Sequence, residues 1–288
     1  MKSTDQLRHL LQQPAILVMP CCYDGLSALL IEQAGFPITF MSGFAVSASL
    51  LGKPDTGLIS YGEMVEHGRA ICAAVSLPVL GDGDTGYGNG VNVKRTVQGY
   101  AQAGFACIMI EDQVSPKRCG HTKGKQVVDR HEASMRIQAA VDARDEGADI
   151  LIMARTDART THDFDEALWR CKEFARIGAD IIFMEAPESI TEMTELCLAI
   201  QQPCMANMIQ NGKTPLLSQQ QLHDIGFKIV AYPLTLLSSA IQAMNTSLTS
   251  LKQDIYPRHQ SFSTLQETIG FPEYYREEAR YRYALSDL

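Results

Sequence analysis

Basic residues are too few in this chain to form a nucleic-acid or anionic-membrane surface. The 288 residues include 25 Lys and Arg against 33 Asp and Glu, a formal net charge of −8, whereas nucleic-acid-binding domains are typically basic. No apolar run is long enough to span a bilayer, and the polar start "MKSTDQLRHLLQQP" has no apolar signal-peptide core. We therefore expect a cytoplasmic protein that binds neither nucleic acid nor membrane.

The sequence also lacks any C-x-x-C pair, which argues against a zinc site. Its eight cysteines are scattered through a large chain, so a disulfide-rich secreted domain is not indicated. They are Cys21, Cys22, Cys72, Cys107, Cys119, Cys171, Cys197 and Cys204. We expect buried free thiols everywhere except at Cys119, which lies in the cationic stretch "KRCGHTKGK" (117–125).

A Gly-rich phosphate loop is missing after the first predicted strand, where "CCYDGLSA" stands. A doubly wound open sheet would normally carry such a loop. Eight apolar, β-rich runs alternate with helix-like stretches, and the runs span 16–24, 38–43, 79–86, 107–112, 150–157, 181–187, 204–209 and 228–234. Five joints repeat a helix-ending glycine before a strand, as in "AQAGFACIMI" and "ARIGADIIF". The pattern predicts an α/β fold, a closed (β/α)8 TIM-type barrel.

Polar side chains end all eight predicted strands. They are Asp24, Ser42, Asp82 with Asp84, Glu111 with Asp112, Arg155 with Asp157, Glu185, Asn207 and Tyr232. Any single carboxylate among them could instead cap the following helix. Because the carboxyl ends of barrel strands meet at one mouth, the whole set predicts a site there.

Carboxylates dominate one side of this predicted mouth. Asp82 and Asp84 are two residues apart and share a face of the strand end, Glu111 ends the next strand, and Asp55 lies in the loop "GKPDTGL". Oxygen ligands without paired histidines suit Mg²⁺, or Mn²⁺, with several waters retained. A lone D-x-D would more simply be a turn, but the addition of Glu111 favours a metal site.

Hydrogen-bond donors occupy the rest of the mouth. Arg155 and Asn207 suit a carboxylate ligand, and the Ser42-Gly43-Phe44 stretch offers a hydroxyl and backbone N–H groups to a second anionic group. Lysine is absent from the strand ends except for Lys228, at the wrong end of the eighth strand. A Schiff-base aldolase is therefore not indicated, and the site fits a small polyanion held against a divalent cation.

Several motifs resemble the isocitrate lyase/phosphoenolpyruvate mutase superfamily: "EDQVSPKRCGH", "ARTDA", "DGDTGYGN", "SGFAVSASLLGKPD", "MEAP" and "NMIQNGKTPL". The resemblance covers roughly residues 15–275 and is nearest to 2-alkylmalate lyases of the 2,3-dimethylmalate lyase and petal death protein type. Methylisocitrate lyases and carboxyphosphonoenolpyruvate mutases are near neighbours. The resemblance implies a barrel over 1–245, a gating loop at about 114–128 and a C-terminal segment, 246–288, swapped between subunits of a homotetramer.

The same resemblance assigns roles to individual residues. It places Mg²⁺ on Asp82 and Asp84, with Asp55 and Glu111 nearby, and makes Cys119 the general acid. The implied substrate-binding set is Ser42, Gly43, Phe44, Asp55, Gly120, Arg155 and Asn207, and the implied catalytic set is Cys119, Arg155, Glu185, Lys117 and His121. Met109 and Ile209 depart from methylisocitrate lyases, which generally carry His and Thr there, so less provision for a third substrate carboxylate is expected.

The function that these features predict is Mg²⁺-dependent cleavage of a 2-alkylmalate to pyruvate and a carboxylic acid by retro-aldol chemistry. Neighbouring Lys117, Arg118 and His121 can lower the thiol pKa of Cys119. The base is left open between a metal-linked carboxylate and Tyr23. The alternatives are oxaloacetate hydrolase or decarboxylase, methylisocitrate lyase and carboxyphosphonoenolpyruvate phosphonomutase activity. A redox-sensing or purely binding barrel is a further alternative, and it would not need the carboxylate set.

Overall fold

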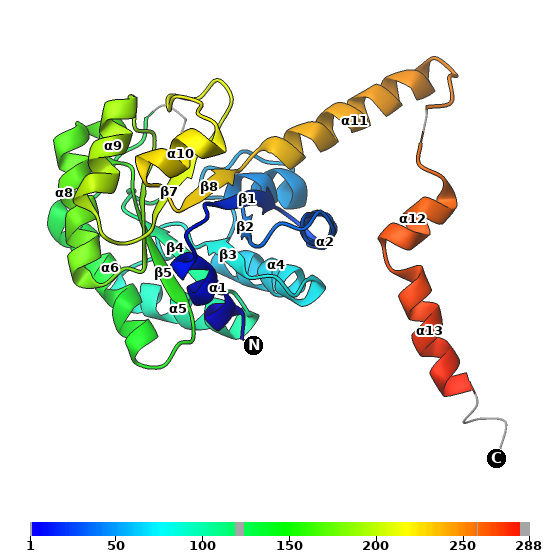
Figure 1. The fold of residues 1–288 in the computed structure, drawn as a ribbon, viewed down its shortest axis with the longest axis horizontal. Helices are drawn as coiled ribbons and strands as arrows, with labels where there is room; N and C mark the ends of the chain where they lie inside the picture. The colour runs from blue at the N-terminus through cyan, green and yellow to red at the C-terminus, as the bar shows by residue number, and fades with distance from the viewer. Residues whose placement is uncertain (1, 119–123, 258, 283–288) are drawn as a thin grey trace. The chain divides into compact units, whose positions relative to one another are not determined.

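The computed structural model describes residues 2–118, 124–257 and 259–282, and the chain falls into two compact units, residues 1–237 and 238–288 (Figure 1). All eight strands belong to the first unit: β1 (Leu17–Cys22), β2 (Thr39–Met41), β3 (Val79–Asp82), β4 (Cys107–Glu111), β5 (Leu151–Thr156), β6 (Ile181–Met184), β7 (Cys204–Asn207) and β8 (Ile229–Tyr232). Each strand lies within one of the eight predicted runs, so the prediction of eight strands at these places is confirmed.

The strands form a closed parallel barrel. Each pairs with the next in sequence order, and β8 pairs with β1, with Ile229 opposite Leu17. This closure confirms the predicted (β/α)8 barrel and excludes the open doubly wound sheet.

Helices connect the strands and form the outer layer of the first unit (Figure 1). In chain order they are α1 (Ser3–Gln12), α2 (Gly25–Gln33), α3 (Gly43–Val46), the π-helix η1 (Ser47–Leu51), α4 (Tyr61–Ala74), α5 (Gly90–Ala103), α6 (Arg130–Asp145), α7 (Ala158–Thr161), α8 (Phe164–Ile177), α9 (Ile190–Ala199) and α10 (Gln219–Ile225). α11 (Thr235–Lys252) begins in the first unit and continues into the second, which also holds α12 (Phe262–Thr268) and α13 (Phe271–Arg282).

The repeated glycines at the helix-to-strand joints all adopt left-handed backbone conformations. Gly35, Gly104, Gly147, Gly178 and Gly226 have φ between +80° and +119°, a region that side chains with a Cβ rarely enter. The predicted helix-ending role of these five glycines is therefore confirmed, and it explains why each chain turn into the next strand is short.

Side-chain alternation along the strands divides the core into two shells. Met19, Leu151 and Met153 are among the buried residues inside the barrel, whereas their neighbours Ile152 and Ala154 pack between the strands and the helices. α1 closes the amino end of the barrel, since its fully buried Leu7 belongs to the interior cluster. The carboxyl end is left for polar side chains.

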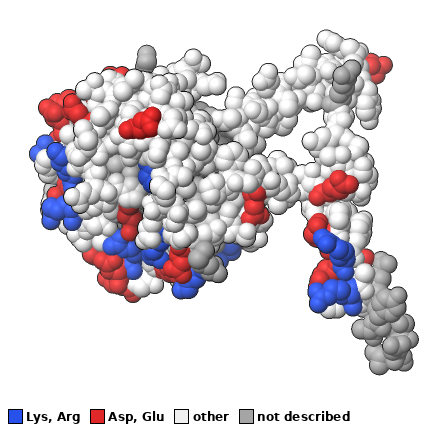
Figure 2. Space-filling view, viewed as in Figure 1, with Lys and Arg blue, Asp and Glu red and all other residues white. Residues whose placement is uncertain are grey.

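The surface of the molecule mixes charges of both signs. On the face drawn in Figure 2, acidic and basic side chains of the first unit are interspersed. Among the described residues, no helix combines the length and apolar character that a membrane crossing requires.

Candidate active site

A cavity lies at the carboxyl ends of the strands, where the sequence predicts the site. Its polar lining consists of Ser42, Asp55, Asp82, Lys117, Arg118, Arg155, Glu185 and Asn207. Its apolar lining consists of Cys21, Phe40, Phe44, Met109, Phe183, Met205, Ile209, Ala231, Pro233 and Leu234. Most of the predicted site residues are thus brought together, on strands β2 to β7 and the loops that follow them.

Close contact between β2 and β3 fixes the first carboxylate. Gly43 N–H donates to Asp82 Oδ2 at 3.2 Å, and Asp84 N–H donates to Asp82 Oδ1 at 3.1 Å. A Cβ built on Gly43 would lie 2.5 Å from Asp82 Oδ2, so only glycine fits there. The sequence predicts that this N–H serves an anionic ligand; in the structure it serves Asp82, while Ser42 and Phe44 line the cavity.

Lys117 joins two of the predicted metal ligands. Its buried ammonium lies 2.7 Å from Asp55 Oδ1 and 2.8 Å from Asp84 Oδ1. Burial acts to lower the pKa of Lys117, but Asp84, Asp82 and Asp55 outweigh it and raise that pKa well above its usual value. Burial also raises the pKa of Asp84 to about 6, against the attraction of Lys117. Lys117 therefore stays in its charged form beside these carboxylates.

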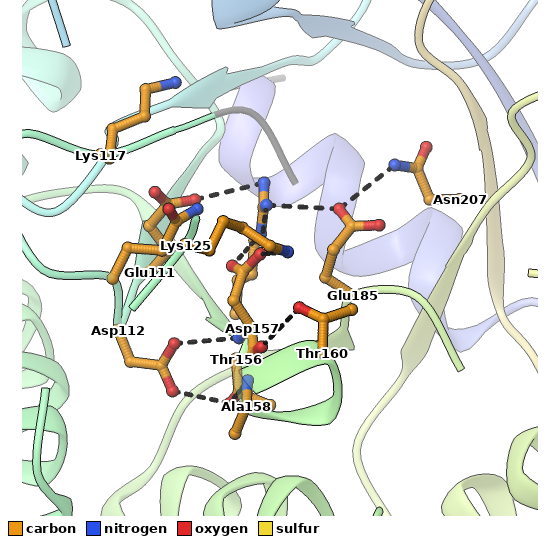
Figure 3. A network of polar contacts seen from close by, with 12 residues as sticks. Glu111, Asp112, Lys117, Lys125, Thr156, Asp157, Ala158, Thr160, Glu185 and Asn207 are labelled. Carbon is orange, nitrogen blue, oxygen red and sulfur yellow. Dashed lines mark hydrogen bonds and ion pairs between the residues drawn. The ribbon is translucent and has the colours of Figure 1, made fainter. Parts of the chain in front are cut away.

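Arg155 lies at the centre of a second group of charges. Its Nε and Nη2 donate to the two carboxylate oxygens of Asp157 at 2.8 and 3.0 Å. Nη1 lies 3.2 Å from Glu111 Oε2, and Nη2 lies 3.4 Å from Glu185 Oε2. Asn207 donates to the same Glu185 oxygen at 3.5 Å (Figure 3). The network links β4, β5, β6 and β7 across the mouth.

The pKa values of the carboxylates around Arg155 are shifted in opposite directions. Burial raises the pKa of Glu111 well above its usual value despite Arg155. Burial also acts to raise the pKa of Asp157, but the charges of Arg155 and Lys125 lower it below its usual value. Asp157 is thus the firmly ionised partner of the Arg155 guanidinium.

Some strand-end residues serve other purposes. Asp24 caps α2, because its carboxylate accepts from Ser27 N–H at 2.7 Å. Tyr232 lines a different, largely apolar pocket on the first unit. The expectation that polar groups from all eight strand ends converge on one mouth is therefore wrong for β1 and β8. Within the described part of the chain, the cavity lining also does not include Tyr23, the alternative candidate base.

Three predicted site residues, Cys119, Gly120 and His121, lie outside the described residues. The described chain on either side is closely held: Gln113 and Val127 form an antiparallel bridge, and Lys117 and Lys125 each reach a buried carboxylate. The roles of Cys119, Gly120 and His121 remain predictions from the resemblance.

The sequence prediction missed two contributors. Asp157 appeared only as a strand-end residue, although its position two residues after Arg155 is a signal that the two share a side of the chain. Lys125 pairs with Asp157 at 2.6 Å and is buried. The sequence gives no sign of this pair, which depends on the path of residues 124–128.

The residues fit a divalent cation in chemistry and charge. Asp55, Asp82 and Asp84 with the single ammonium of Lys117 leave a formal charge of −2, which one Mg²⁺ would balance. No described hydrogen-bond partner reaches the buried Glu111 Oε1, so an oxygen acceptor is left over at the same rim. Among the described residues no three acidic, His or Cys side chains already converge as a metal cage. Carboxylate oxygens are the ligands that suit Mg²⁺, which usually keeps several waters.

Comparison with known families decides the membership of the chain. The phosphoenolpyruvate phosphomutase family model matches residues 7–252. The chain belongs to this family. It is therefore an enzyme of the isocitrate lyase/phosphoenolpyruvate mutase superfamily, whose members include lyases and mutases, as the motifs predict.

Individual relatives agree with this membership. The chain is 41% identical over 286 residues to 2,3-dimethylmalate lyase of Eubacterium barkeri, covering 98% of this chain and 99% of that protein. A structure of oxaloacetate acetylhydrolase with the inhibitor 3,3-difluorooxalacetate matches with a TM-score of 0.92 and 31% identity, over 96% of both chains. Phosphonopyruvate hydrolase in complex with oxalate and Mg²⁺ matches with a TM-score of 0.86 and 28% identity, over 98% of this chain and 99% of the other.

Proposed function

We propose that the enzyme cleaves the C2–C3 bond of a 2-alkylmalate, releasing a 2-oxo acid such as pyruvate and a carboxylic acid. The observation that carries the proposal is the mixed lining of the cavity: Arg155 and Asn207 are among its polar residues, and Phe44, Ile209 and Leu234 are among its apolar residues. A dianionic substrate with alkyl groups matches both parts. The dimethylmalate lyase at 41% identity supports the same substrate class.

The apolar lining residues also bear on the alternatives. Met109 and Ile209, where methylisocitrate lyases generally carry polar residues, both line the cavity. A third carboxylate would be desolvated against them without a partner, which disfavours 2-methylisocitrate. Oxaloacetate lacks alkyl groups that could contact these apolar residues, although the oxaloacetate acetylhydrolase structure has the same fold and 31% identity.

Asp55, Asp82 and Asp84 would hold Mg²⁺. When bound, the cation would neutralise charge on the carboxylate and hydroxyl oxygen of the substrate. Arg155 would bind and orient the C1 carboxylate by its planar fork. A carboxylate of the Asp55, Asp82 and Asp84 group would take the proton of the C2 hydroxyl.

Bond cleavage then needs an acid for carbon. As the C2–C3 bond breaks, C2 becomes a carbonyl and the electron pair passes to C3 and its carboxylate. We assign to Cys119 the delivery of its thiol proton to C3, which completes the carboxylic acid, and solvent returns the proton to sulfur. Arg118 and Lys117, beside it in the sequence, would favour the thiolate that remains. The reaction is redox-neutral.

A substrate panel tests the proposal. 2,3-dimethylmalate, 2-ethyl-3-methylmalate, 2-methylisocitrate and oxaloacetate would be incubated with the enzyme and Mg²⁺ and followed by ¹H NMR. We expect the two alkylmalates to give the highest kcat/KM, and Cys119→Ser to abolish turnover. Exclusive cleavage of oxaloacetate would replace the proposal with a hydrolase, and no C–C cleavage of any member would reject it.

We also propose that the active enzyme is a homotetramer built from helix-swapped dimers. In the first unit, a pocket over β1 and β8 is lined by Val18, Leu30, Phe36 and Tyr232, among others, on outer faces that a complete helical layer would cover. In the second unit, α11 exposes Ile241, Met244, Leu248 and Leu251 at three- and four-residue spacings, which form one apolar stripe. The stripe of one subunit would fill the pocket of its partner.

Light scattering after size exclusion tests this assembly. Leu248→Glu should lower the particle mass while the circular dichroism of the barrel is retained. Val91→Glu changes a more exposed apolar residue, on α5 (76% exposed), and should leave the mass unchanged. An unchanged tetramer in the Leu248 variant, or a wild-type monomer, would contradict the proposal.

A further inference from the structure

Asp157 occupies a helix N-cap position, but its side chain does not cap the helix. It precedes α7 as the N-cap residue, yet its side chain makes no cap hydrogen bond. The Thr156 hydroxyl accepts from Ala158 N–H instead, at 3.1 Å. An aspartate at an N-cap normally stabilises the start of its helix. Because the Asp157 carboxylate does not do so, other groups must account for its position.

Two buried cations hold it. The Arg155 guanidinium makes two parallel hydrogen bonds to the Asp157 carboxylate, and Lys125 Nζ lies 2.6 Å from Oδ1. Asp157 is 0% exposed and, within the described chain, is not part of the cavity lining. It therefore reaches the cavity through Arg155, which does line it.

The contacts of Arg155 are graded. The bonds to Asp157 are short and bidentate, whereas Glu111 and Glu185 lie at 3.2 and 3.4 Å. Bidentate pairs fix the plane of a guanidinium, and looser ion pairs do not. Asp157 is thus the group that sets the direction in which Arg155 faces.

A buried ion pair behind the mouth fixes Asp157 in turn. Asp112 Oδ1 accepts from Asp157 N–H at 2.9 Å, and Oδ2 accepts from the Thr156 hydroxyl at 2.6 Å (Figure 3). Arg170, from α8, donates to Oδ2 at 3.0 Å, and both charged side chains are at most 2% exposed. The backbone that carries Asp157 is therefore tied to β4 and to the helical layer.

We propose that Asp157 is a positioning residue, which holds the Arg155 guanidinium in its carboxylate-binding direction and links it to Lys125, while Asp112 and Arg170 hold Asp157 in place. The proposal rests on the proposed function in taking Arg155 as the carboxylate-binding group. It adds a chain of contacts that runs from Arg170 on α8 through Asp112 and Asp157 to Arg155 at the cavity.

Asp180 serves as a control for Asp112, because both aspartates accept a hydrogen bond from a backbone N–H of β5 or of the residue that follows it. Asp180 Oδ2 accepts from Ile152 N–H and from Arg144 Nη1, both at 2.8 Å, at the amino end of β5. Asp112 and Asp180 thus have the same chemistry, an aspartate between a β5-side backbone N–H and an arginine, at opposite ends of the strand. The Asp112 side chain is 1% exposed and that of Asp180 is 29% exposed, so a merely structural role predicts that any loss of oxalate affinity follows the loss of stability in each variant.

Calorimetric titration with oxalate in the presence of Mg²⁺ measures carboxylate binding without turnover. We expect Asp157→Asn to weaken oxalate binding about tenfold or more, because the charged, bidentate partner of Arg155 is lost. Asp112→Asn should weaken it at least roughly threefold, and Asp180→Asn should leave it within about twofold even where it lowers the melting temperature equally.

Equal oxalate affinity in Asp157→Asn and wild type, or equal losses in the Asp112 and Asp180 variants, would overturn the proposal. If Asp157→Asn does not fold, Lys125→Met decides the matter, with the exposed Lys2→Met, which breaks a surface pair with Asp149, as its control. Only the Lys125 variant should bind oxalate more weakly, and equal binding in both would overturn the proposal. Wild type that binds no oxalate would overturn it too, whereas oxalate binding without cleavage of any dicarboxylate rejects only the proposed function.

Discussion

At the amino end of the barrel, apolar side chains close the interior, whereas at the carboxyl end charged side chains are buried around a cavity. Leu7 of α1 is fully buried in the interior cluster, with Leu10 and Leu11 partly buried beside it. At the other end, Asp82, Glu111 and Arg155 are each at least nine-tenths buried. At the amino end, the burial of apolar surface stabilises the fold. At the carboxyl end, the burial of charged groups costs free energy, because the groups lose their hydration.

This contrast indicates that the amino end of the barrel contributes mainly to stability and the carboxyl end mainly to the site. A barrel that needed only stability would close both ends with apolar side chains, since a buried ion pair rarely stabilises more than a well-packed apolar group. The mouth instead buries several carboxylates close together, and this burial is the main reason why the pKa values of Asp84 and Glu111 are raised. Under the proposed function, a bound cation and an anionic substrate would offset this cost.

The largest expected effect is on activity, at the mouth. Asp82→Asn should lower kcat/KM at least roughly a hundredfold, because the proposed oxygen ligand for Mg²⁺ loses its charge. The free energy of unfolding should stay within about 1 kcal/mol of wild type or rise, because one of several repelling carboxylates is gone. Steady-state kinetics and urea denaturation would measure the two quantities. A loss of stability as large as the loss of transition-state stabilisation would erase the distinction between the two ends.

A smaller effect, of the opposite kind, is expected at the amino end. Leu7→Ala should lower the free energy of unfolding by about 2–5 kcal/mol, because it leaves a cavity in the barrel interior. The kcat of the folded enzyme should change less than about twofold, since α1 does not contribute to the mouth. Urea denaturation and kinetics at low temperature would test this. A large fall in kcat with little loss of stability would show that the two ends are coupled.

The regular parts of this molecule could be predicted from its sequence. The eight strands are buried on both faces and so appear as apolar runs, and each joint glycine marks a left-handed turn that other residues resist. The polar residues at the strand ends also indicated where the mouth lies, because parallel strands in a barrel bring their carboxyl ends together.

The failures have physical causes as well. Tyr232 points outward because Ile229 and Ala231 occupy the interior face of β8, and counting alternate residues would have found this. Asp24 lies beyond the last residue of β1, where the strand pairing no longer fixes side-chain direction, and it caps α2. The pairs of Lys117 with Asp55 and of Lys125 with Asp157 join residues far apart in the sequence, and local patterns contain no information about them.

Turnover of 2,3-dimethylmalate in D₂O with Mg²⁺ tests the central claim, retro-aldol cleavage at the barrel mouth, most directly. Because the thiol of Cys119 exchanges with solvent, our account predicts pyruvate and propionate in equal amounts, with a single deuterium at C2 of the propionate, read by ¹H NMR and mass spectrometry. Cleavage without that deuterium, or unchanged dimethylmalate in the presence of folded enzyme and Mg²⁺, would contradict it.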